Sequence, residues 1–136
     1  MSWLVDTNIL SELRKGTRAD AGTRAWFDAA RAEELYTSVL VVGEIRRGIE
    51  LLRRRDPAGA DVLDGWLRRL VDDFGDRVLP VDAAVADRWG RLNVPDPVPT
   101  VDGLLAATAL VHNMTLVTRN LRDVGATGVV ALDPSA

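Results

Sequence analysis

Short apolar runs alternate with longer stretches in which apolar residues recur every three or four positions. Short runs bounded by polar residues are typical of buried strands, and the longer spacing is typical of amphipathic helices. The pattern predicts strands at residues 3–5, 35–38, 77–81, 115–118 and 129–132, and helices at 9–14, 20–32, 39–55, 61–74, 83–92 and 102–112. This alternation predicts an α/β fold with a mostly parallel sheet that is covered on both faces.

Local signals place several boundaries. Asp56-Pro57 ends the third predicted helix, Asp82 is a natural N-cap for the helix at 83–92, and prolines make residues 93–100 a loop. We find no internal repeat and no linker, so we expect one domain over residues 1–136.

Composition narrows the function classes. The net charge of −3 argues against a protein that coats nucleic acid through charge alone, although it permits local contacts. All basic residues except Lys15 are arginines, which suit phosphate because the guanidinium donates two parallel hydrogen bonds. The chain has no cysteine, no apolar stretch long enough for a membrane span and no secretion signal, so we expect a cytoplasmic protein.

Three carboxylates occupy positions that a turn, a helix cap or a surface location alone explains poorly. Asp6 directly follows the first apolar strand, although a turn or cap would also explain it. Glu44 falls on the apolar side of its helix, where an ionised carboxylate needs a partner such as a metal or an arginine. Asp102 opens a helix that is apolar nearly all round, where a first-turn acid is also favoured by the helix dipole.

Taken together, the three acids predict a metal site. An α/β sheet brings the carboxyl ends of its strands to one edge, and like carboxylates that lie close repel unless a cation separates them. Mg²⁺ or Mn²⁺ suits all-oxygen ligands, whereas the absence of cysteine and the single histidine argue against zinc. His112 ends its predicted helix and is expected to be a helix-terminal charge and not a ligand.

The ordered motifs resemble those of PIN-domain proteins, and most closely the VapC toxins of bacterial toxin–antitoxin pairs. The resemblance rests on residues 4–8, 11–13, Ser38-Val39 with Glu44, residues 102–109 and residues 116–120, and it covers essentially the whole chain. It implies a three-layer fold with a five-stranded, mostly parallel sheet flanked by helices. It also implies a Mg²⁺- or Mn²⁺-dependent endoribonuclease acting on transfer, ribosomal or messenger RNA, a homodimer, and inhibition by a VapB-like antitoxin.

The resemblance also assigns roles to individual residues. It makes Asp6, Glu44 and Asp102 the catalytic, metal-binding acids. It places orienting roles on polar residues beside them, namely Thr7, Asn8, Thr118 and Asn120. The family often has a further acid where this chain has Asn120, with Asp123 as a candidate substitute ligand, so the binding of a second metal is an open question.

The expected reaction is hydrolysis by a metal-activated water, which leaves a 5′-phosphate and a 3′-hydroxyl. Candidate RNA contacts are Arg119, Arg46 and Arg47, for which a solvated surface is an equally good explanation.

Three other readings stay open. A haloacid-dehalogenase-type phosphotransferase normally needs a second acid where this chain has Asn8, and a receiver-like module needs a lysine near a late strand, whereas the chain's lysine is Lys15. A catalytically inactive PIN-like module that binds RNA or protein is the third.

Overall fold

The computed structural model describes residues 1–135, so the last residue of the predicted domain lies outside the described residues. The strands are β1 (Trp3–Val5), β2 (Leu35–Ser38), β3 (Val78–Leu79), β4 (Thr115–Val117) and β5 (Ala131–Leu132). The helices are α1 (Thr7–Leu13), α2 (Ala21–Ala29), α3 (Val39–Arg53), α4 (Pro57–Phe74), α5 (Ala83–Leu92), α6 (Thr100–Val111) and α7 (Leu121–Val124).

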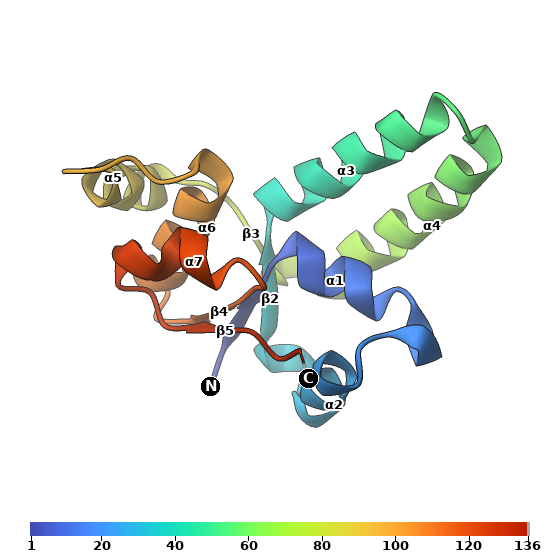
Figure 1. Ribbon diagram of the computed structural model, residues 1–136, viewed down its shortest axis with the longest axis horizontal. Helices are drawn as coiled ribbons and strands as arrows, with labels where there is room; N and C mark the ends of the chain where they lie inside the picture. Colours follow the sequence, from blue (N-terminus) through green and yellow to red (C-terminus); the bar gives the residue numbers. More distant parts are fainter. Residues whose placement is uncertain (136) are drawn as a thin grey trace.

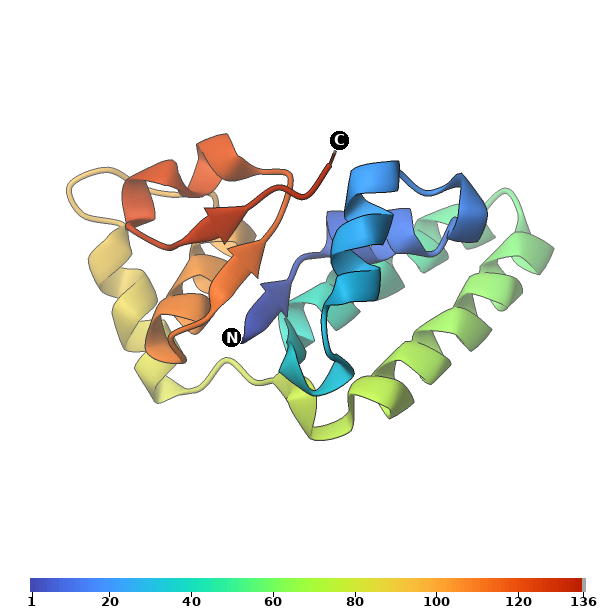
Figure 2. The same cartoon turned by 90° about the horizontal axis from the view of Figure 1, so that it is seen from below.

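The strands form one parallel sheet in the order β3-β2-β1-β4-β5. The sheet lies in the middle, with α1 to α4 on one side and α5 to α7 on the other (Figures 1 and 2). The predicted α/β architecture with five strands is therefore confirmed. Every predicted strand and helix is present, although β3 and β5 are shorter than expected, and the sequence pattern missed the single turn of α7.

The core forms where the central strands meet the helices on both faces. Leu4, Val5, Leu116 and Val117 of β1 and β4 are at most 1% exposed. Helix α6 is buried along most of its length, as its apolar sequence predicts, and it packs beside α5. A rigid centre of this kind holds the ends of β1 and β4 in fixed positions.

Helices α3 and α4 form an antiparallel pair that extends beyond the sheet (Figure 1). Asp56 separates them, and its carboxylate accepts a hydrogen bond from the Gly59 amide at 3.0 Å, which caps α4. No helix within residues 1–135 is long and apolar enough to cross a membrane.

Candidate metal centre

Asp6 lies at the carboxyl end of β1, where the strand order of the sheet reverses. The chain fills one half of the sheet with β2 and β3 and then crosses to β4, on the other side of β1. The Asp6 amide donates to the Val117 carbonyl of β4 at 3.0 Å, which fixes the residue between the two strands. The sequence pattern predicted the position of Asp6 at the carboxyl edge of the sheet, and such a reversal point is where open α/β sheets bind ligands.

The Asp6 carboxylate is nearly inaccessible, with 4% of the residue exposed. Its Oδ1 accepts from the Thr7 amide and its Oδ2 from the Thr118 hydroxyl, both at 2.7 Å. Burial nevertheless raises the pKa of Asp6; the two hydrogen bonds lower it, and the nearby Glu44 carboxylate raises it further. None of these groups is cationic, so the ionised form has no counter-charge from them.

Asp102 approaches the same position from the first turn of α6. Its Oδ1 accepts from the Asn120 side-chain amide at 3.3 Å. Burial is the main cause that raises the pKa of Asp102, and the Asp6 and Asp123 carboxylates raise it further while Asn120 lowers it. The structure therefore brings Asp6 and Asp102 together, with Asp123 beside the second of them.

Glu44 does not lie on a buried face, so that part of the sequence interpretation is wrong. The buried stripe of α3 consists of Val41, Ile45 and Ile49, and Glu44 lies outside it, exposed to solvent. Its Oε1 accepts from the Thr7 hydroxyl at 2.7 Å. Glu44 thus reaches the site from its solvent side and needs no buried partner.

The donor chemistry of the site fits a hard divalent cation. Hydrogen bonds through Thr7 connect Asp6 to Glu44, and hydrogen bonds through Thr118 and Asn120 connect Asp6 to Asp102. Within residues 1–135 no group of three or more acidic, histidine or cysteine side chains lies close enough together to hold a metal ion, so the structure does not show the predicted convergence of all three acids on one cation. Mg²⁺ keeps several of its waters and is commonly held by one or two carboxylates, so an open set of oxygen ligands suits it.

The loop after β4 supplies polar partners to both Asp6 and Asp102. Thr118 donates to Asp6, and its hydroxyl oxygen accepts from the Asn120 amide at 3.0 Å. The Arg119 amide donates to the Asn8 side-chain oxygen at 3.3 Å, which joins this loop to α1. The predicted polar residues therefore surround the acids, with Asn120 oriented toward Asp102.

Glu12 holds this loop in place, a role the sequence interpretation missed. Only 7% of Glu12 is exposed, and its carboxylate accepts from the Asp20 amide at 2.9 Å and from Lys15 at 3.0 Å. It also pairs with the Arg119 guanidinium at 3.0 Å. The sequence contained a signal for this role, because Glu12 lies on the same side of its short helix as the apolar Ile9. The same kind of position drew attention to Glu44.

We expect Glu12→Gln to weaken the fold in a pH-dependent way. The hydrogen bond from the Asp20 amide is the largest of the causes that lower the Glu12 pKa from 4.5 to about 2. A lowered pKa means that the ionised group stabilises the native state above about pH 4.5, and this stabilisation is lost as the pH falls through about 2. Urea unfolding at pH 7 and pH 3 should show a smaller pH effect in the variant. Glu33→Gln, which removes an exposed pair with Arg31, should change little, and equal effects would contradict the prediction.

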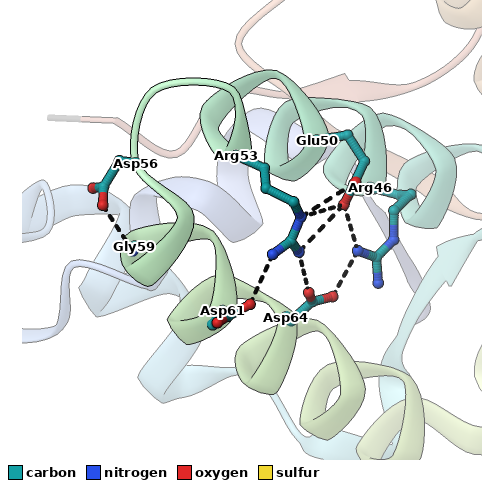
Figure 3. Close-up of polar contacts among 7 residues, drawn as sticks. All are labelled: Arg46, Glu50, Arg53, Asp56, Gly59, Asp61 and Asp64. Atoms are coloured by element: carbon teal, nitrogen blue, oxygen red, sulfur yellow. Dashed lines mark hydrogen bonds and ion pairs between the residues drawn. The ribbon is translucent and has the colours of Figure 1, made fainter.

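The arginines that the sequence suggested as RNA contacts differ in whether their guanidinium groups are free to bind RNA. Arg46 lies 2.6 Å from Asp64 and 3.1 Å from Glu50, and together with Arg53 it joins α3 to α4 in the ion-pair network of Figure 3. The Arg119 side chain is held by Glu12. These pairings argue against the predicted RNA contacts through the guanidinium groups of Arg46 and Arg119, whereas Arg47 is exposed.

Comparisons with known proteins show the family and the fold. The family model described as PIN domain matches residues 3–124. The toxin FitB of Neisseria gonorrhoeae is 30% identical over 137 residues, and a VapC ribonuclease of Sinorhizobium fredii is 32% identical over 142 residues, each alignment covering 96% of both chains. The crystal structure of FitAcB from N. gonorrhoeae superposes with a TM-score of 0.88 at 30% identity and covers 97% of both chains.

Proposed function

The chain belongs to the PIN-domain family, and from that membership we propose that it is a Mg²⁺- or Mn²⁺-dependent endoribonuclease, the toxin of a VapC-type toxin–antitoxin pair. Relatives named as a VapC ribonuclease and as the toxin FitB support the class. The observation that carries the proposal is Asp6, a buried carboxylate at the reversal point of the sheet whose pKa is raised and which has two further acids beside it.

Asp6, Asp102 and Glu44 are the residues that would hold the cation, with Asp123 as a further ligand beside Asp102. A bound divalent cation supplies an acidified water and neutralises charge on a phosphate. Thr118 fixes one oxygen of Asp6 and leaves the carboxylate in a single orientation. Asn120 does the same for Asp102, and Thr7 holds one oxygen of Glu44 at the solvent side of the site.

The reaction is hydrolysis of an RNA phosphodiester bond. The oxygen of water bonds to phosphorus, the bond from phosphorus to the 3′ oxygen breaks, and that oxygen takes up a proton. The products are a 5′-phosphate and a 3′-hydroxyl. A 2′,3′-cyclic phosphate would instead require the 2′-hydroxyl of the RNA as nucleophile and would contradict the proposed role of the carboxylates.

The test is cleavage of total cellular RNA by the purified chain, free of antitoxin, with Mg²⁺ or Mn²⁺ and with the product ends mapped. Discrete cuts with 5′-phosphates that disappear with EDTA and in Asp6→Asn are expected. Cuts that survive both controls would remove the carboxylate site as the catalyst. Metal binding without any cleavage would instead favour the catalytically inactive PIN-like module.

The partners follow from the same proposal. The RNA class stays open among transfer, ribosomal and messenger RNA, since neither the motifs nor the site geometry selects one. A VapB-like antitoxin and a homodimer are the expected protein partners, and the cytoplasm is the expected location, because the substrate is there. Size-exclusion chromatography with light scattering tests the dimer directly.

A further inference from the structure

A groove of about 350 Å³ leads away from the carboxylate site between α1 and the α3–α4 pair. Its lining includes Thr7 and Glu44 of the carboxylate site, together with Arg14, Gly48, Arg55, Trp66 and apolar side chains. We propose that this groove binds the single-stranded RNA that enters the site, with Arg14 and Arg55 as its phosphate-binding residues. The inference rests on the proposed function and names where its substrate lies.

The guanidinium groups of Arg14 and Arg55 are available to a ligand. Arg14 and Arg55 are both exposed, and neither pairs with an acidic side chain anywhere in residues 1–135. Arg46, Arg53 and Arg119, by contrast, are each held by carboxylates. Two of the three predicted RNA contacts, Arg46 and Arg119, are therefore already paired with carboxylates. Arg14 and Arg55, which the sequence did not single out, have charges free for a ligand.

Two separate helices position the charges of Arg14 and Arg55 at the same groove. Arg14 ends α1, and Arg55 follows the last turn of α3, so the charges come from two separate elements that line the same groove. The Arg14 guanidinium lies over the Trp66 ring, 6.0 Å from its centroid, which limits its freedom before any ligand binds. An arginine that is already ordered loses less entropy when it binds phosphate.

The remaining lining of the groove suits the bases of a single-stranded nucleic acid. Besides the two arginines and the polar side chains of Thr7, Ser11 and Glu44, the lining of the groove is apolar or aromatic apart from Gly48. A Cβ built at Gly48 would meet no atom within 4 Å. A second hollow of about 280 Å³ shares Arg14 and Trp66 and adds Phe27 and Arg69. Cationic side chains alternating with aromatic and apolar surface are what single-stranded nucleic acid requires, since phosphates need charge and bases need flat surface.

The first experiment measures binding without cleavage. A fluorescein-labelled single-stranded oligouridylate is titrated with the full-length Asp6→Asn protein at several salt concentrations, so that binding is read whether or not the wild type cleaves. Arg14→Gln and Arg55→Gln should each weaken binding and lower the slope of log K against log salt by about 0.7, the value for one lost phosphate contact on a single strand. Arg54→Gln, at an exposed position outside the groove, is the matched control and should leave the slope unchanged.

The second experiment fills the groove sterically. Gly48→Leu places a side chain into the groove, whereas Gly43→Leu places one into the separate hollow that Val39 and Leu67 line, and both positions are free of contacts at Cβ. Both variants should fold, because leucine favours a helix more than glycine does. We expect oligouridylate binding to weaken in Gly48→Leu and to stay unchanged in Gly43→Leu.

The outcomes separate this inference from the proposed function. Slopes that stay unchanged in both arginine variants would overturn the RNA groove, even if the wild type cleaves RNA in the presence of Mg²⁺. If Gly48→Leu blocks a protein partner while RNA binding is unaffected, the groove accommodates a polypeptide and the inference is wrong. Reduced slopes in a protein that never cleaves would support the groove and reject the nuclease.

Discussion

Replacing Asp6 with asparagine is expected to remove RNA cleavage while leaving the metal-free protein at least as stable as the wild type. Loss of a residue that merely supports a metal ligand typically costs about 10- to 100-fold, so loss of the ligand itself should reduce the single-turnover cleavage rate by more than about 100-fold. Stability behaves differently because burial raises the pKa of Asp6. A raised pKa means that the ionised carboxylate destabilises the native state at neutral pH, and an amide avoids that cost.

The measurements are cleavage kinetics with Mg²⁺ and thermal melting in EDTA. The stability difference between Asp6→Asn and wild type should shrink as the pH is lowered from neutral, because the raised pKa lets the Asp6 carboxylate take up a proton at a higher pH in the folded than in the unfolded chain.

Asp82 provides the matched control. It also stands beyond a strand and caps the following helix, α5, by accepting from the Val85 amide at 3.0 Å, but it lies outside the carboxylate site. Asparagine is about as good an N-cap as aspartate, so Asp82→Asn should change neither cleavage nor stability appreciably. If Asp6→Asn behaved in the same way, Asp6 would be a cap and no more.

The second large effect is expected from the divalent cation. Mg²⁺ should raise the melting temperature of the wild type because it supplies the counter-charge that Asp6 and Asp102 otherwise lack. At a free concentration 100 times its dissociation constant, a ligand that binds only the native state contributes about 2.7 kcal/mol. For a chain of this size that corresponds to a rise in melting temperature of roughly 10 °C.

Differential scanning fluorimetry with increasing Mg²⁺, and with Ca²⁺ and K⁺ beside it, measures the rise. It should be absent in Asp6→Asn and much reduced in Asp102→Asn, and K⁺ at matched ionic strength should produce no comparable change. An equal Mg²⁺-dependent rise in wild type and Asp6→Asn would place the cation elsewhere on the protein and would reject the proposed centre.

The sequence by itself determined most of the architecture. Residues 3–5 and 35–38 matched the observed β1 and β2, because a short apolar run with polar ends has few alternatives to a buried strand. The apolar sequence of α6 required a buried helix, which is why the acid in its first turn drew attention. The neighbouring residues were also enough to identify Asp6 as a candidate site residue, because a carboxylate that directly follows a buried strand lies at the edge of the sheet.

The tertiary structure alone decided which faces are buried and which charges are free. Helical periodicity places Glu44 beside apolar neighbours, but the packing of α3 against α4 and the sheet buries Val41, Ile45 and Ile49 and leaves Glu44 outside. Glu12 meets Arg119 across more than a hundred residues of sequence, and Arg14 meets the groove that Arg55 also lines. Periodicity is a property of neighbouring residues, whereas pairing and burial depend on contacts between distant segments, which local pattern does not encode.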